Sequence, residues 1–185
     1  CGFGELADHL AQRGAVVVGV DVDQRMISAA KQAFGNNPNL NFIHGDSTDL
    51  REVIGSRTFD LGVCQDSTHH LRDGNRLQEF FRSLTACCDT VVVKDFDRSQ
   101  AKTKNTFWRL LFTNPSTVAL LADSLEAAFT EDEVREVTDG LPNASVEPAP
   151  NMQIHGSREL KEIIKLDPVP RHLDERFSWL FRSKK

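Results

Sequence analysis

The chain has 185 residues, of which 39% are hydrophobic and 26% are charged. This composition is typical of a globular protein and excludes a disordered or collagen-like chain. The net charge of −5 disfavours a general electrostatic attraction for nucleic acid. No apolar run approaches the roughly 20 residues that a membrane span needs, so we expect no span.

Strand and helix patterns alternate through the first half of the chain. Short apolar runs predict strands over residues 16–20, 40–44, 59–64 and 90–93. Asp23 is placed to cap a helix after the first run, and Asp73-Gly74 opens another after the third. Strands that alternate with helices predict an α/β fold with a mostly parallel sheet.

The second half of the chain changes character. Residues 96–129 contain no strand pattern and predict a helical insertion, and Thr130 with Glu133 forms a capping box at the start of another helix. Residues 144–147 and 152–155 predict two short strands, which must pair antiparallel because the link between them is too short for a parallel crossover. Helical spacing then predicts a helical tail over residues 157–185 that follows a domain of residues 1–156.

The four cysteines are Cys1, Cys64, Cys87 and Cys88. They show neither a zinc-ligand spacing nor a disulfide framework, so we predict reduced thiols, a cytoplasmic location and no metal site. Because the chain opens on Cys1 in the middle of a motif, we expect any N-terminal signal to lie upstream.

A glycine loop and an acidic residue carry the first chemical signal. Gly2 and Gly4 let backbone N–H groups approach a ligand at the start of a helix. Asp21 ends the next strand, where a carboxylate can accept hydrogen bonds from both hydroxyls of a ribose. With Ala7 the loop also fits the loose dinucleotide pattern. The alternative is a strand-end Asp21 that only caps a helix.

Five short runs resemble the class I S-adenosylmethionine-dependent methyltransferases over about residues 1–156. These are Cys-Gly-Phe-Gly at 1–4, Gly-Val-Asp-Val-Asp-Gln-Arg-Met-Ile at 19–27, His-Gly-Asp at 44–46, Phe-Asp-Leu-Gly-Val-Cys-Gln-Asp at 59–66 and His-His-Leu at 69–71. The resemblance implies a Rossmann-like sheet with a closing antiparallel pair and helices on both faces. It also implies a central strand before Cys1 that this sequence lacks, so we expect an N-terminally truncated chain of low stability.

The resemblance also implies roles for matching residues in binding S-adenosylmethionine. It places Asp21 at the ribose with Val22 against the adenine, and Asp46 at the adenine amino group with Ser47 beside it. It places three residues at the methionine end of the cofactor: Gly2, Gly4 and Gln65. Asp46 has a separate physical argument, because Gly45-Asp46 ends a strand at the edge of the sheet where such folds bind ligands. The alternative is a turn residue that bonds its own loop.

Three polar residues follow the third predicted strand, where the resemblance places the transferred methyl group: Asp66, His69 and His70. A histidine there could take a proton from a hydroxyl or amine nucleophile. The alternative for each is a packing or capping role at the start of a helix.

Methyl transfer to a small-molecule acceptor is the function that these motifs favour. Aromatic residues in the insertion, such as Phe107, Trp108 and Phe112, either pack it onto the sheet or line an apolar acceptor pocket. A nicotinamide-dependent oxidoreductase uses the same loop and acid, although the chain has no tyrosine to serve as a reductase acid. A non-catalytic cofactor-binding module is the third possibility.

Overall fold

A computed structural model of the chain describes residues 1–100, 115–141, 143–149 and 178–184. The described residues form two compact units, one of residues 1–57 and one that begins at Thr58. Among the helices described, none is long and apolar enough to cross a membrane. The predicted domain boundary after residue 156 lies outside the described residues and stays a prediction.

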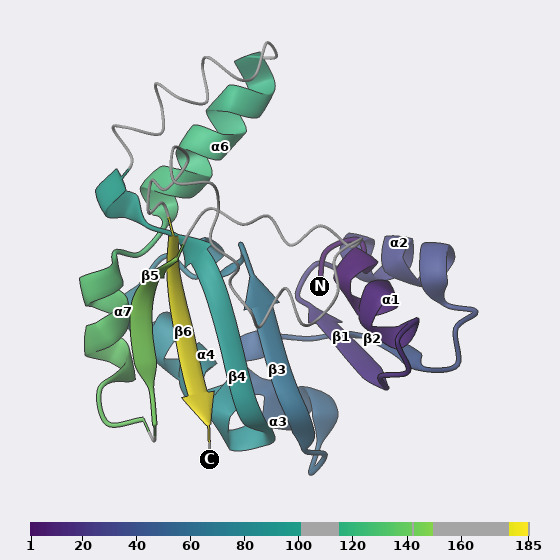
Figure 1. The fold of residues 1–185 in the computed structure, drawn as a ribbon. Coiled ribbons are helices and arrows are strands. Elements are labelled where there is room, and N and C mark those ends of the chain that lie inside the picture. Colours follow the sequence, from purple (N-terminus) through teal and green to yellow (C-terminus); the bar gives the residue numbers. More distant parts are fainter. Residues whose placement is uncertain (101–114, 142, 150–177, 185) are drawn as a thin grey trace. The chain divides into compact units, whose positions relative to one another are not determined.

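The first unit is a two-stranded parallel sheet with short helices. Its elements are α1 (Glu5–Ala11), β1 (Val17–Asp21), α2 (Gln24–Phe34), β2 (Leu40–His44), η1 (Ser47–Asp49) and α3 (Leu50–Ile54) (Figure 1). β1 and β2 pair from Val17–Leu40 to Asp21–His44. Asp23 caps α2 as predicted, since its side chain accepts the N–H of Arg25.

Phe42 of β2 is the centre of the core of this unit. It is buried with Ala7, Ile27 and Ala30, which come from α1 and α2. Gly4 is pressed against the same ring, because a Cβ atom at this position would lie 2.8 Å from Phe42 Cζ. The packing of Phe42 therefore holds the glycine loop close to the sheet.

The second unit is a four-stranded sheet with the order β3-β4-β6-β5. Its elements are β3 (Phe59–Gln65), η2 (Thr68–His70), α4 (Gly74–Cys87), β4 (Cys88–Phe96), η3 (Arg98–Gln100), α6 (Pro115–Ala127), α7 (Glu131–Thr138), β5 (Ser145–Ala149) and β6 (Ser178–Lys184). β3 and β4 are parallel, and β6 is antiparallel to both of its neighbours. The predicted α/β fold is thus confirmed, with parallel strands first and an antiparallel closing pair last.

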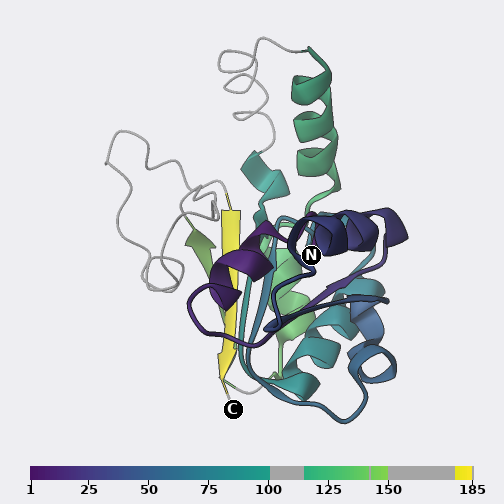
Figure 2. The same ribbon diagram turned by 90° about the vertical axis from the view of Figure 1, so that its right-hand side faces the viewer.

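Helices α4 and α7 lie side by side on one face of this sheet (Figures 1 and 2). The face of α4 that contacts the sheet is the predicted apolar stripe, of which all four residues are buried: Leu77, Phe80, Phe81 and Leu84. The predicted capping box is also present, because Thr130 and Glu133 each accept the other's backbone N–H. Local patterns in the sequence therefore identified both helices.

Among the described residues, β5 pairs with the last strand of the chain, and its predicted pairing with residues 152–155 stays a prediction. β5 pairs with β6 from Ser145–Arg182 to Ala149–Ser178, and the predicted partner strand at 152–155 lies outside the described residues. The helix predicted for the end of the tail is therefore wrong at residues 178–184. Helical spacing of a few apolar residues also fits a short apolar strand, and periodicity alone does not separate the two. In the folded chain this segment is hydrogen-bonded to strands on both sides.

Candidate active site

The glycine loop and Asp21 are in direct contact, although 19 positions separate Gly2 from Asp21. The N–H of Gly2 donates to Asp21 Oδ2 at 2.8 Å, and the amino group of Cys1 lies 2.7 Å from the same oxygen. The N–H of Asp23 donates to Oδ1 at 2.9 Å. Burial raises the pKa of Asp21, but these three hydrogen bonds outweigh it and hold the pKa below its usual value. Asp21 is therefore ionised at neutral pH.

The two glycines of the loop differ in what surrounds them. Gly4 has a φ of +87° and is the residue before α1, and its lack of a side chain is required by Phe42. Gly2 has a φ of +54°, but no described atom lies within 4 Å of the position that a Cβ would occupy. Gly4 thus has a packing role inside the unit, while the backbone at Gly2 borders open space.

Val22 is the residue after Asp21, and its side chain is 69% exposed. An exposed branched apolar side chain beside an ionised carboxylate offers a contact for the apolar face of a ligand. Its predicted contact with adenine stays a prediction.

Asp46 and Ser47 follow β2 at the same sheet edge as Asp21. The backbone connects the two acids, since the N–H of Gly45 donates to the carbonyl of Asp21 at 3.0 Å. Asp46 Oδ1 accepts from the N–H and the hydroxyl of Thr48, at 2.9 and 2.8 Å. The turn role that the sequence left open for Asp46 is therefore present in the structure. Its predicted role toward adenine is not tested.

In the second unit, Gln65 is the last residue of β3 and Asp66 follows it. Gln65 Nε2 donates to Asp66 Oδ2 at 2.9 Å, and Lys94 Nζ lies 3.5 Å from Asp66 Oδ1. Asp66 adopts a φ of +49°, which is uncommon for a residue other than glycine. Lys94 is 4% exposed, so a buried ammonium group faces this carboxylate. The sequence analysis did not identify Lys94.

A buried carboxylate, Asp95, organises the histidine segment. It is the next-to-last residue of β4 and accepts from the Thr68 hydroxyl at 2.6 Å, the His69 N–H at 3.0 Å and the Phe96 N–H at 2.8 Å. His69 Nδ1 lies 2.9 Å from Oδ1 of the same carboxylate. Burial raises the pKa of Asp95, but the bonds from His69 and its neighbours outweigh it and lower the pKa. Asp95 is thus an anion at neutral pH.

His69 and His70 have different environments. The His69 side chain is 5% exposed, whereas His70 is exposed and its ring centroid lies 4.2 Å from that of His69. Asp95 was missed in the sequence, although a signal was present: Lys94-Asp95 ends a β-branched run at the carboxyl end of a parallel strand, where α/β folds bind ligands.

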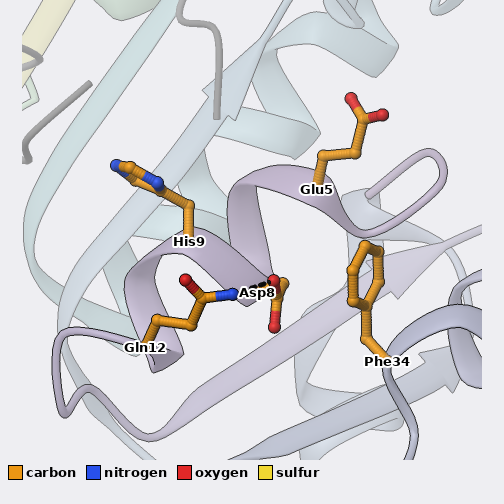
Figure 3. A pocket seen from close by; sticks show the side chains of 5 residues that line it. All are labelled: Glu5, Asp8, His9, Gln12 and Phe34. Atoms are coloured by element: carbon orange, nitrogen blue, oxygen red, sulfur yellow. Dashed lines mark hydrogen bonds between the residues drawn. The ribbon is translucent and has the colours of Figure 1, made fainter. Parts of the chain in front are cut away.

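A hollow of about 330 Å³ lies on the first unit beside α1 (Figure 3). Its lining residues come from α1 and the end of α2: Glu5, Asp8, His9, Gln12 and Phe34. Figure 3 shows Gln12 hydrogen-bonded to Asp8 within it. None of the predicted site residues lines this hollow, so it gives no support to their predicted roles.

Residues 1–89 match the family model described as a methyltransferase domain. Over 86 residues the chain is 34% identical to the proposed methyltransferase YqeM of Bacillus subtilis (strain 168). This match covers 45% of the present chain and 34% of YqeM. Over 55 residues it is 40% identical to ribosomal RNA small subunit methyltransferase A of Geobacter metallireducens. This match covers 29% of the present chain and 20% of that protein. The matched regions therefore cover about a third or less of these curated relatives.

A solved structure shows the same fold. The plantazolicin methyltransferase BamL, crystallised with a triazolic desmethylPZN analogue and SAH, superposes with a TM-score of 0.69 at 16% identity, over 100% of this chain and 74% of that one. These matches do not favour the oxidoreductase alternative. Residues 1–89 thus match a methyltransferase domain by sequence, and the chain has the fold of a solved methyltransferase.

Proposed function

We propose that the chain binds S-adenosylmethionine and transfers its methyl group to a small-molecule acceptor. The observation that carries the proposal is the 2.8 Å bond between the Gly2 N–H and the Asp21 carboxylate. It joins the two motifs from which the sequence predicted a cofactor site. A glycine loop before a helix and an ionised acid after the next strand are the features that bind the polar parts of a nucleoside cofactor.

Each predicted binding residue has a chemical role in this proposal. Asp21 accepts from the ribose hydroxyls. Its two oxygens have four lone pairs, of which the N–H groups of Gly2 and Asp23 occupy two, so the second hydroxyl replaces the amino group of Cys1. Val22 contacts the adenine, while Asp46 and Ser47 lie near its amino group. Gly2, Gly4 and Gln65 are assigned to the methionine end.

The chemical step makes limited demands on the protein. S-adenosylmethionine supplies an electrophilic methyl carbon, so the chain must orient the acceptor, exclude water and, for a protonated nucleophile, remove a proton. Asp66, His69 and His70 are the candidates for that last task. Asp66 already contacts Gln65 and Lys94, which supports a role for it in holding the strand end rather than in proton transfer.

A small-molecule acceptor is supported by the charge of the chain. A net charge of −5 works against a nucleic acid acceptor, whose binding is dominated by phosphate contacts with basic residues. The comparisons do not decide this point, because one relative is named for ribosomal RNA and the structural neighbour is named for plantazolicin. The aromatic residues proposed to line the acceptor pocket lie outside the described residues. The cytoplasmic location also stays a prediction.

Calorimetric titration with S-adenosylhomocysteine tests the binding half of the proposal. We expect the unmodified chain to bind and Asp21→Ala to lose most of its affinity. Absence of binding by the unmodified chain, under conditions where circular dichroism shows it to be folded, would refute the proposal. Binding without methyl transfer to any compound in a pool of small metabolites would instead favour the non-catalytic module.

A further inference from the structure

We propose that Asp95 is a positioning residue that holds His69 as the proton acceptor of the reaction, and that the acceptor molecule therefore reacts through a hydroxyl group. This inference rests on the proposed methyl transfer. It goes beyond that proposal because it selects one of the three candidate bases, adds Asp95 to the site and names the chemical class of the acceptor.

The contacts of Asp95 determine which nitrogen of His69 carries a proton. Both carboxylate oxygens lie within reach of His69 Nδ1, at 2.9 and 3.2 Å. An ionised carboxylate can only accept hydrogen bonds, so Nδ1 must be the donor. In a neutral imidazole the other nitrogen, Nε2, then has no proton and can accept one.

The carboxylate itself is held rigidly. The Thr68 hydroxyl and the backbone N–H groups of His69 and Phe96 all donate to it, and Asp95 has no exposed surface. A base whose ring is oriented by a fixed third group is the arrangement that nucleophilic and general-base sites use. The rotamer and tautomer of His69 are thus set before any substrate arrives.

The second ring nitrogen of His69, Nε2, has no hydrogen-bond partner among the described residues. The rings of His70 and Phe96 flank the imidazole, with centroids at 4.2 and 5.8 Å, and no described residue forms a hydrogen bond with Nε2. A buried polar atom without a hydrogen bond is unfavourable, because it has lost its bonds to water. A hydroxyl group of the acceptor molecule would supply the bond that this nitrogen lacks.

A hydroxyl acceptor balances the proton transfer. As a lone pair of the hydroxyl oxygen forms the bond to the methyl carbon, the carbon–sulfur electron pair remains on sulfur and the hydroxyl proton passes to His69 Nε2. The resulting imidazolium is stabilised by the Asp95 anion. Carboxylate acceptors are ionised at neutral pH and need no base, whereas alcohols and phenols keep their proton and do.

Two phenols of different acidity separate a base from a structural role. At about pH 8.5 an ordinary phenol such as 4-methylphenol keeps its proton, whereas 4-nitrophenol has lost its proton. Methyl transfer from labelled S-adenosylmethionine would be measured for both probes. We expect Asp95→Asn to slow transfer to 4-methylphenol by about 100-fold and transfer to 4-nitrophenol by less than about 3-fold, because an ionised probe needs no base.

Asp97→Asn is the matched control. Asp97 is also buried and also accepts a backbone N–H, from Ser99 at 2.8 Å, but it does not contact His69. We expect both probes to react at nearly the normal rate in this variant. An equal loss for the two probes in Asp95→Asn would overturn the proposal, as would a loss in His70→Asn but not in His69→Asn.

Nitrogen-15 NMR of the histidine rings provides a readout that needs no acceptor. We expect the proton of neutral His69 on Nδ1, and its displacement from Nδ1 in Asp95→Asn. A proton on Nε2 in the unmodified chain would overturn the dyad whether or not the cofactor binds. If S-adenosylhomocysteine binds but neither phenol is methylated, the hydroxyl acceptor is refuted while cofactor binding stands. If it does not bind, the proposed function fails and NMR alone decides the dyad.

Discussion

Replacing Asp21 with alanine is the sharpest test of the cofactor site. The carboxylate is ionised, and in the proposed complex it accepts from two ribose hydroxyls. Hydrogen bonds to a charged group contribute about 1.5–3 kcal/mol each, so the loss of both is worth at least about 3 kcal/mol, which is roughly a hundredfold in Kd. We therefore expect the affinity for S-adenosylhomocysteine to fall by about two orders of magnitude.

The same change has a structural cost that must be measured separately. The N–H groups of Gly2 and Asp23 lose their acceptor, and each such loss costs about 1–3 kcal/mol if the group stays dry. Asp23→Ala is a suitable control, because Asp23 lies two residues away and only caps α2 and pairs with Arg25. It should lower the stability by about 1 kcal/mol and leave binding nearly unchanged.

Calorimetry at a temperature where both variants are folded, as shown by circular dichroism, separates the two effects. Binding by Asp21→Ala within a few-fold of the unmodified chain would show that Asp21 does not contact the ribose. An equal loss of affinity in Asp21→Ala and Asp23→Ala would show that the loop, and not the carboxylate, determines binding.

Three further changes test other parts of the reasoning. Gly4→Ala places a Cβ atom 2.8 Å from the ring of Phe42 at a positive φ. Denaturant unfolding should therefore show a loss of about 2 kcal/mol or more in the free energy of unfolding. Gly2→Ala, whose Cβ meets no described atom, should lose less stability but weaken cofactor binding. Thr130→Val removes the acceptor of the capping box and should cost about 1 kcal/mol in the same assay, with Thr130→Ser close to normal; no loss would show that the cap is dispensable. The pKa of Asp95 is lowered in the folded chain, so its stabilising effect is complete above pH 3.8, the usual pKa of an aspartate, and is lost as the pH falls through the lower folded pKa. The loss of stability with falling pH, followed by fluorescence, should therefore be shallower in Asp95→Asn. Identical curves for the two proteins would contradict this reasoning.

Several features of this chain follow from neighbours in the sequence. The caps at Asp23, Asp73 and Thr130 were predicted because a capping side chain bonds N–H groups only two or three positions away. The parallel strands were predicted because β-branched runs between helices have few other uses. The resemblance to methyltransferases likewise depends on short contiguous runs, which can be identified in the sequence without the structure.

Tertiary structure alone decided the remaining features. Residues 178–184 form a strand because β4 and β5 provide hydrogen-bonding partners on both sides, and an apolar run does not contain that information. Lys94 and Asp95 resemble a solvated strand end in the sequence, yet both are buried. Asp95 can be buried as an anion only because Thr68, His69 and Phe96 supply its hydrogen bonds. Since Thr68 and His69 lie more than 25 positions away, the hydrogen bonds of Asp95 to the histidine segment become visible only when β3 and β4 are paired.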